Sequence, residues 1–575
     1  MAAIENSALM VYARSRRDLF RIYGTLGACI AALMALLSFP VALPIGESFW
    51  DTYIYIDGAH RMAIGQDIYR DFHAPVGPLN YVLFNALESL FPDGNVVFVI
   101  QWSLMLVTVP AIAVICWHAL ARGPAVAFAL LLPYLLFSVL PFNDSSWNAF
   151  PGVDGFAYYN RHAALLIYLL VASLFFVRSQ VALVVLVSGL LLALAFLKIN
   201  GFMAAGMILA VALITRRIGA RAAIVVAVLC LAVTGLIELR SGVVSAYVAS
   251  VLRLIDSNSS ELVIRILTTG TARFDIIFTS SLLAAYLLWS RRRGSPDLVR
   301  SFDRDAPRVP HPNRLDRDWV WAGTLIAANI LFESQNFGGA AFISLWPLLV
   351  VLFLGRAPAE RMRLSPLVVL IGLIAAPPVV GVVHSAAHAA ASSIRDVRLD
   401  AEHLPAAMSF RTKALTLEAA EKSRPILAAG RETYQRYADA AILPAYWLYF
   451  DHQFQLNVLE TMDEVIAAIH AREARLGLRY DVIDLRDFAN PIPAIMGRIP
   501  AKGVSIGGDP FRTVLPLTEA EAEMLSRTDL VLIPTCPVTM ARRKLLSDYA
   551  HAYEGFNRVQ LTPCFDALEH PDHSS

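Results

Sequence analysis

The segment "FWDTYIYIDGAHRMAIGQDIYRDFHAPVGPLNYVLF", residues 49–84, separates the first long apolar run of the chain from the next one. It places an acid, Asp51, soon after the apolar run ends and continues with a stretch rich in Tyr, His, Arg and Asp. The chain around it has 575 residues, of which 57% are hydrophobic and 17% charged, and a mean hydropathy of +0.55. Soluble proteins rarely have this composition, so the segment is interpreted as a polar loop between two membrane spans.

About eleven apolar runs are candidates for membrane-spanning helices. They lie at roughly 22–44, 95–118, 124–141, 162–177, 181–197, 201–215, 222–239, 274–290, 318–333, 340–355 and 365–385. Basic residues in short loops collect on the cytoplasmic side, and "RSRRDLFR" precedes the first run, which we interpret as a retained anchor. Alternation then puts the first loop (45–94), the Lys198 turn and everything after about 386 outside. The sequence predicts an α-helical polytopic membrane protein whose transmembrane part covers residues 1–385.

Residues 386–575 have a different pattern. "LETMDEVIAAIHAREARL" has helical periodicity, whereas "YDVIDL", "DLVLIP" and "RVQLTP" are typical of short buried strands. Thr518 and Glu521 have the spacing of a helix capping box. These features predict a soluble, extracytoplasmic α/β domain at the C-terminus. Cys536 and Cys564 each follow a predicted strand, and whether they form a disulfide stays open.

Several function classes lack support in the sequence. The net charge of +1 gives no basic field for nucleic acid. The chain contains no CxxC or HExxH spacing and no GxxxxGK loop. We therefore expect no nucleotide, no bound metal and no ATP-driven transport, and we expect the chemistry to lie on the external face.

The first loop contains two acids in a predicted helix over 49–64. Phe49, Trp50, Tyr53 and Tyr55 have the composition of an interfacial aromatic belt. Asp57 is followed four residues later by Arg61, and an ion pair explains both of them. Asp51 has no cation at its helical neighbours, which leaves two alternatives: a helix N-cap, or a catalytic carboxylate at the membrane boundary.

The first loop also resembles that of the GT-C glycosyltransferases, which use polyprenyl-phosphate sugars and include protein O-mannosyltransferases and lipid A aminoarabinose transferases. The resemblance comprises Asp51, Gly65 with Tyr69, and "PVGPL" (75–79), together with "FLKINGF" around Lys198. The pattern departs from many relatives, which have Asp-Glu where this chain has Asp51-Thr52 and a Lys before the Pro-rich motif.

This resemblance implies a sugar transfer at the membrane surface with Asp51 as general base, inversion at the anomeric carbon and no metal requirement. The leaving polyprenyl phosphate gains negative charge, which nearby cations stabilise. The candidate phosphate-binding residues are Lys198, Arg161, Arg70 and His162. The candidate substrate-binding residues are Tyr55, Tyr69, His73, Asn143, Asp144, Gln335 and Asn336. The implied partners are a polyprenyl-phosphate sugar donor, a glycan or lipid acceptor and the bilayer of a bacterial inner membrane.

Two other functions stay open at this point. One is a transporter or flippase of lipid-linked glycans, for which internal repeats and broken helices at the membrane midplane are typical. The other is a glycan ligase or polymerase that uses lipid diphosphate donors. A glycosyltransferase requires Asp51 and Lys198 to converge near one external cavity, whereas a transporter requires a path that opens alternately to both sides.

Overall fold

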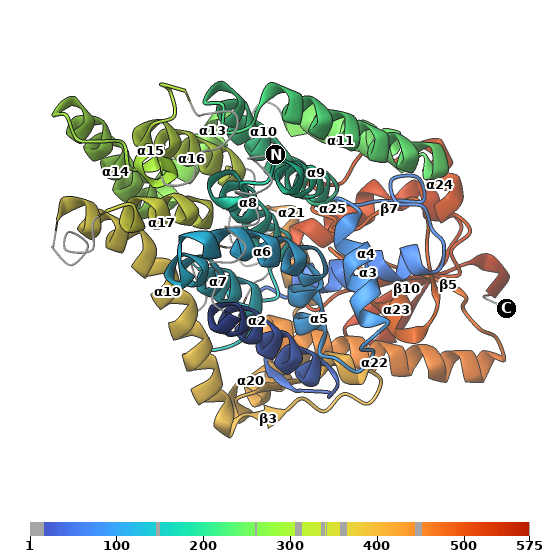
Figure 1. Cartoon of the computed structure of the whole chain (residues 1–575). Coiled ribbons are helices and arrows are strands. Elements are labelled where there is room, and N and C mark those ends of the chain that lie inside the picture. Colours follow the sequence, from blue (N-terminus) through green and yellow to red (C-terminus); the bar gives the residue numbers. More distant parts are fainter. Residues whose placement is uncertain are drawn as a thin grey trace.

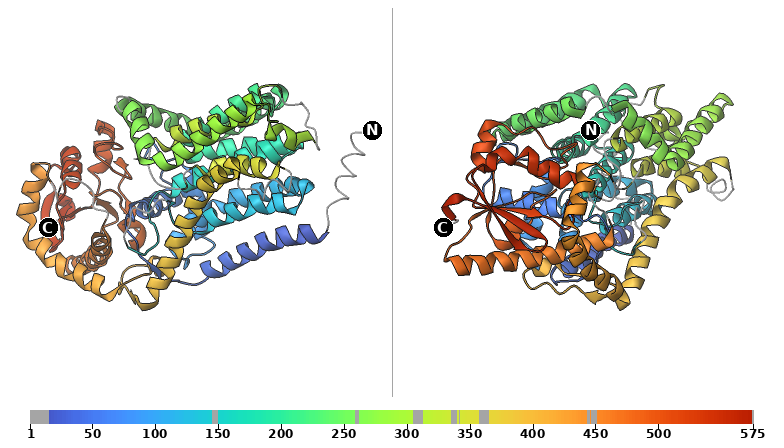
Figure 2. Two further views of the ribbon diagram at one scale, coloured as in Figure 1. Left: turned by 90° about the vertical axis from the view of Figure 1, so that its left-hand side faces the viewer. Right: turned by 180° about the vertical axis from the view of Figure 1, so that it is seen from behind.

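The computed structural model describes residues 16–144, 150–258, 262–304, 313–334, 340, 342–356, 365–442, 445 and 451–573. They form a helical body and a C-terminal domain that covers one end of it (Figures 1 and 2). The helices of the body are α2 (Arg16–Leu37), α5 (Val96–Ser103), α6 (Met105–Ala119), α7 (Pro124–Val139), α8 (Tyr158–Phe176), α9 (Gln180–Leu197), α10 (Ile199–Ile214), α11 (Ala220–Ser241), α12 (Val243–Asn258), α13 (Leu262–Ala272), α14 (Phe274–Arg292), α15 (Leu298–Arg304), α16 (Asp318–Glu333), α17 (Trp346–Leu354) and α19 (Pro366–Ser392).

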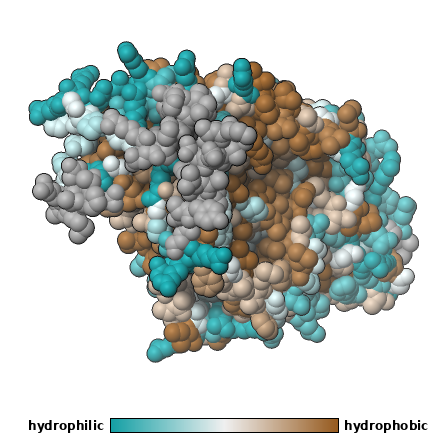
Figure 3. All heavy atoms as spheres, viewed as in Figure 1, coloured by the Kyte–Doolittle hydropathy of each residue, from teal (hydrophilic) through white to brown (hydrophobic). Residues whose placement is uncertain are grey.

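Every predicted apolar run coincides with a helix or with a pair of consecutive helices. Within the described ranges, six helices are long and apolar enough to cross a membrane by themselves, or seven if the bent pair α13–α14 counts as one span. Helix α8 is buried along its whole length and forms the centre of the body. Helix α11 instead exposes apolar side chains such as Leu231 (72%) and Leu236 (67%). A broad apolar surface lies between two polar ends in Figure 3, as expected for a protein that sits in a bilayer.

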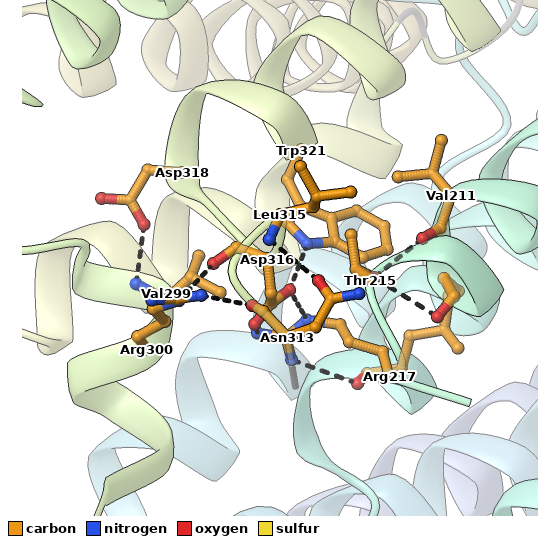
Figure 4. Close-up of polar contacts among 12 residues, drawn as sticks. Val211, Thr215, Arg217, Val299, Arg300, Asn313, Leu315, Asp316, Asp318 and Trp321 are labelled. Atoms are coloured by element: carbon orange, nitrogen blue, oxygen red, sulfur yellow. Dashed lines mark hydrogen bonds and ion pairs between the residues drawn. The ribbon is translucent and has the colours of Figure 1, made fainter. Parts of the chain in front are cut away.

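The end of the body away from the C-terminal domain carries the basic loops that the charge pattern places together. The Arg217 guanidinium forms a buried bidentate ion pair with Asp316, at 2.7 and 2.9 Å, and the indole N–H of Trp321 donates to the same carboxylate at 2.7 Å (Figure 4). The Asp318 carboxylate accepts from the backbone N–H groups of Leu298 and Val299, at the start of α15. These bonds fix the connection between α14 and α16 against the α10–α11 turn.

The first loop contains β1 (Leu43–Pro44), α3 (Trp50–Ala63), β2 (Phe72–His73) and α4 (Leu79–Glu88). Helix α3 confirms the predicted helix over 49–64. The Asp57–Arg61 ion pair is also present at 2.7 Å, but both side chains are fully buried and do not lie on a helix surface.

The C-terminal domain is α/β, as predicted. Its helices are α20 (Ala414–Ala429), α21 (Arg431–Asp439), α22 (His452–Leu476), α23 (Ile492–Met496), α24 (Glu519–Leu525) and α25 (Met540–Asp548). Its strands are β3 (Val397–Arg398), β4 (Phe410–Thr412), β5 (Val482–Leu485), β6 (Ile499–Pro500), β7 (Val504–Ser505), β8 (Leu530–Pro534), β9 (Asn557–Thr562) and β10 (Phe565–Glu569). The main sheet has the order β6-β5-β8-β10-β9, in which β5 pairs in parallel with β6 and β8, and β10 pairs antiparallel with β8 and β9.

Three local predictions for this domain can be compared with the structure. Thr518 and Glu521 form the expected capping box of α24, and Cys536 and Cys564 form a disulfide between the ends of β8 and the β9–β10 hairpin. The prediction that "RVQLTP" is a buried strand is wrong, because β9 is the edge strand of the sheet and is mostly exposed.

The first loop and the C-terminal domain share two small sheets. Strand β1 pairs in parallel with β4, and β2 pairs in parallel with β7. The buried Arg61 guanidinium donates to the Ala501 carbonyl at 2.6 Å, and Gln66 donates to the Pro500 carbonyl at 2.7 Å. Figure 1 shows α3 and α4 (blue) beside the C-terminal domain (orange and red). The domain thus builds directly on the loop that carries Asp51.

Candidate active site

Asp51 lies in the first turn of α3 and only 2% of its surface is exposed. The N-cap position is Phe49, which makes no side-chain capping bond, so the N-cap alternative for Asp51 is wrong. One oxygen of the Asp51 carboxylate accepts a hydrogen bond from the backbone N–H of Ala157, at 2.7 Å. The carboxylate is therefore held by a distant segment of the chain and not by its own helix.

The loop before α8 is fixed to α3 by further bonds. The Thr52 N–H donates to the Gly155 carbonyl at 3.3 Å, and the Thr52 hydroxyl lies 3.1 Å from the Tyr158 hydroxyl. Ala157 has a left-handed backbone conformation, with φ at 62°, which ends the loop and starts α8. The N-terminal end of the central helix is therefore docked onto the first turn of α3.

Two aromatic residues beside Asp51 attach α3 to the C-terminal domain. The Trp50 ring packs against the rings of Phe454 and Phe488, at 5.7 and 5.6 Å between centroids. Trp50 and Tyr53 also line a small cavity with room for about one water molecule, at the carboxyl ends of β5 and β8 beside the disulfide. The prediction of an aromatic belt in the lipid interface is wrong for these residues, because their rings are buried between the two parts of the protein.

Lys198 occupies the turn between α9 and α10, on the same side as Asp51. Its ammonium donates to the Asn160 side-chain carbonyl and lies over the rings of Tyr159, at 4.8 Å, and Phe332, at 5.5 Å. Tyr159 and Asn160 belong to the first turn of α8, which also holds Asp51 through Ala157. Lys198 and Asp51 are therefore both held by the first residues of α8 and the loop just before it.

The charges of the two residues act on each other. Burial raises the pKa of Asp51 to about 6; the Ala157 N–H, the Lys198 and Arg161 charges and a bond from Tyr159 act in the opposite direction. Burial, together with the positive charge of Arg512, lowers the pKa of Lys198 to about 7, while the charges of Glu333 and Asp51 act in the opposite direction. Near neutral pH the site thus holds an ionised acid of raised basicity beside an ammonium of raised acidity, a combination typical of catalytic sites.

The "PVGPL" motif brings the first loop to the Lys198 turn. The Gly77 N–H donates to the Leu197 carbonyl at 3.0 Å, and a Cβ on Gly77 would lie 2.0 Å from the Phe196 carbonyl oxygen. Only glycine permits this approach. Asn80 donates to the Leu197 carbonyl at 2.9 Å and accepts from the Tyr55 hydroxyl at 2.8 Å, so Tyr55 supports the motif and its predicted contact with substrate is untested.

Arg161 lies in α8, and its charge acts on Asp51. Its guanidinium donates to Gln101 at 3.0 Å, to Asn143 at 2.7 Å and to the Phe156 carbonyl at 3.0 Å. The Asn143 backbone N–H donates in turn to Asp154, at 2.7 Å. Arg161 and Asn143 therefore hold the loop around the site, whereas contacts of either residue with phosphate or sugar stay predictions.

Two other predicted site residues, His162 and Asp144, contact groups of the protein. His162 contacts the Gln101 carbonyl at 3.2 Å, and Asp144 pairs with Arg273 at 3.4 Å. The Arg273 guanidinium also lies 3.8 Å from Glu333. The negative charge of Glu333 also acts on Lys198 and raises the pKa of its ammonium.

Three further candidates, Arg70, Tyr69 and His73, lie in the first loop and contact other parts of the protein. The Arg70 side chain is about half exposed and pairs with Asp67 at 3.9 Å. The Tyr69 hydroxyl donates to the Val76 carbonyl, and its ring stacks on Tyr247 of α12 at 5.1 Å. His73 bonds to Glu521 of the C-terminal domain, at 2.7 Å. The predicted residues Gln335 and Asn336 lie outside the described residues.

Sequence reasoning misses several members of the site. Tyr159 and Asn160 belong to the polar and aromatic stretch "YYN" (158–160), but nothing in the sequence relates them to Asp51 or Lys198. Arg273 and Arg512 come from segments far away in the chain and carry no recognisable motif. Within the described ranges no group of three or more His, Cys, Asp or Glu residues could hold a metal ion.

Comparisons with known proteins add one finding. No protein-family model matches the chain, and no curated protein is significantly similar to it. Two solved structures are similar, both of ArnT from Cupriavidus metallidurans. The one bound to undecaprenyl phosphate has a TM-score of 0.43 and 13% identity, over 96% of this chain and 99% of that chain. The apo structure has a TM-score of 0.42 and 13% identity, over 95% and 98%.

ArnT is a lipid A aminoarabinose transferase of the GT-C type. The solved structures that this chain is similar to are therefore of the same type as the family that the first-loop motifs resemble.

Proposed function

We propose that this protein is an integral membrane glycosyltransferase that moves a sugar from a polyprenyl-phosphate donor to an acceptor of the bacterial cell envelope. The observation that supports this most is the convergence of Asp51 and Lys198, from the first loop and the α9–α10 turn, on the first turn of α8. Such a donor keeps its lipid tail in the bilayer and its phosphate at the membrane boundary. Lys198 is placed for such a phosphate, because it lies in the turn that joins the apolar helices α9 and α10.

The proposed reaction needs a base, Asp51, and a cation, Lys198. An acceptor hydroxyl attacks the anomeric carbon, its proton passes to the Asp51 carboxylate, and the bond from that carbon to the phosphate oxygen breaks. The polyprenyl phosphate leaves with the bonding electrons, so its charge becomes more negative and the Lys198 ammonium stabilises it. A single displacement of this kind inverts the anomeric centre.

The raised pKa of Asp51 agrees with this role. A general base is most effective when its pKa lies near the working pH, because it is then ionised and still basic enough to take a proton. A carboxylate with a pKa of about 6 meets that condition at neutral pH. Since only 2% of Asp51 is exposed, the acceptor has to displace a neighbouring side chain to reach it.

A complementation experiment tests the proposal without knowledge of the sugar or the acceptor. A strain that lacks the gene should accumulate a polyprenyl-phosphate sugar, measured by mass spectrometry of extracted lipids. The natural protein and the Asp67→Asn variant, whose side chain is 65% exposed, should remove the accumulated lipid, and Asp51→Asn should not. A deletion strain with an unchanged lipid profile, or full complementation by Asp51→Asn at equal membrane levels, would overturn the assignment.

A further inference from the structure

A turn of the C-terminal domain, residues 505–514, is attached to the first loop where "PVGPL" (75–79) begins. It follows β7, which pairs with β2, and the Ile506 N–H donates to the His73 carbonyl at 2.8 Å. Gly507 has a positive φ of 63°, and a Cβ on it would lie 2.8 Å from the Pro75 ring. The turn and Pro75 are therefore in direct contact.

The same short segment reaches Lys198 on its other side. Two residues after Pro75, Gly77 makes its backbone contact with Phe196 and Leu197, which immediately precede Lys198. The Pro75–Gly77 segment therefore contacts the 505–514 turn at Pro75 and the residues before Lys198 at Gly77.

The turn has a defined shape that fixes the position of Arg512. The Asp509 carboxylate accepts from the Phe511 N–H at 3.0 Å, and the Asp509 carbonyl accepts from the N–H groups of Arg512 and Thr513, at 3.1 and 2.8 Å. The Arg512 charge acts on both Asp509 and Lys198, and the Arg265 charge, from α13, also acts on Asp509. Charged groups of the turn thus interact with charges on both α13 and the Lys198 turn of the membrane body.

We propose that Arg512 is a phosphate-binding residue which the C-terminal domain supplies to the site, and that it binds the donor phosphate together with Lys198. Two cations held beside each other repel, and an anion between them removes that repulsion. A guanidinium can form two parallel hydrogen bonds to a phosphate, which the ammonium of Lys198 cannot. The inference rests on the proposed function, because it concerns the same donor.

This role gives the C-terminal domain a function in the reaction beyond the support of α3. Negative charge on the phosphate grows as the sugar leaves, so a second fixed cation stabilises the transition state more than the bound donor. Asp509 offers a purely structural partner for Arg512, and the experiment has to separate these two roles.

The test uses the full-length protein in detergent micelles and undecaprenyl phosphate as the probe. Loss of one charge-assisted interaction should weaken probe binding by roughly ten- to a hundredfold in Arg512→Gln, and less in Arg512→Lys. The control is Arg527→Gln, in the same domain, whose side chain is 74% exposed and pairs with Glu523 of α24. It should bind the probe as the natural protein does.

The pH dependence of binding provides a second readout, which reports whether the Arg512 charge acts on Lys198. Lys198 faces Arg512, Glu333 and Asp51, and the Arg512 charge is one cause of its lowered pKa of about 7. Removal of Arg512 should therefore move the loss of probe binding at high pH to a higher pH. In Arg527→Gln this limb should stay in place.

The possible failures are distinguishable. If Lys198→Met loses probe affinity and Arg512→Gln keeps it, the inference about Arg512 is overturned and the proposed donor site stands. If neither variant binds the probe less tightly, the phosphate site of the proposed function fails as well. An effect of Arg512→Gln on the acceptor alone, with unchanged probe affinity, also overturns the inference. If Arg512→Gln does not fold, the same comparisons are made with Arg512→Lys.

Discussion

Replacement of Asp51 by asparagine removes a proton acceptor and leaves the local structure in place. Asparagine has the same shape, and its side-chain oxygen can still accept the hydrogen bond from the Ala157 N–H. The amide cannot take a proton from an acceptor hydroxyl. Any loss of turnover in this variant therefore reports on base catalysis, provided that the protein still folds.

The size of the effect follows from the role of the carboxylate. Loss of a general base reduces kcat by about 10²–10⁴, which corresponds to roughly 3–5 kcal/mol of transition-state stabilisation. The folded protein should become more stable at the same time. Folding raises the pKa of Asp51 from 3.8 to about 6, so above pH 6 the ionised side chain costs up to about 3 kcal/mol that the neutral amide does not.

The assay is kcat/KM against pH for the purified protein, together with thermal unfolding of each variant in detergent. In the natural protein kcat/KM should fall below pH about 6, as Asp51 is protonated, and above pH about 7, as Lys198 loses its proton. Asp51→Asn should lose the acid limb and keep the basic limb. A folded Asp51→Asn variant within a few-fold of natural turnover, or one that retains the acid limb, would refute the reasoning.

Three further predictions concern the framework of the site. In Gly77→Ala the new Cβ would lie 2.0 Å from the Phe196 carbonyl oxygen, so it should push the first loop away from the Lys198 turn and reduce kcat/KM. The control Gly206→Ala, whose Cβ meets no atom within 4 Å, should leave kcat/KM unchanged. Equal kcat/KM values for the two variants would show that this close approach is not needed. Arg217→Met leaves the buried Asp316 carboxylate without its guanidinium partner and should lower the free energy of unfolding by about 3–5 kcal/mol. In the same unfolding assay, the double variant Arg217→Met/Asp316→Leu should recover much of this loss. Removal of the Cys536–Cys564 disulfide by a double serine substitution opens a loop closed over 28 residues and should cost about 3–4 kcal/mol, to be checked by unfolding with and without reductant; an unchanged midpoint would contradict it.

The apolar runs and the α/β character of the C-terminal domain could both be predicted from the sequence. These features depend on local composition: a helix in a bilayer, for example, needs a long apolar run whatever its tertiary contacts. Asp51 could be singled out in the same way, because its helical neighbours offer no cation while Asp57 has Arg61.

What surrounds Asp51 is decided by the tertiary structure alone. The Ala157 N–H, Tyr159 and Lys198 come from α8 and the α9–α10 turn, and Arg512 comes from a turn of the C-terminal domain. No local pattern records that these segments meet. The burial of Trp50 and Tyr53 between the two parts of the protein has the same origin. Trp and Tyr are enriched both at lipid interfaces and at protein interfaces, so their presence in the sequence does not distinguish the two. Burial also sets the raised pKa of Asp51, because that shift depends on how much water the packed chain removes from the carboxylate.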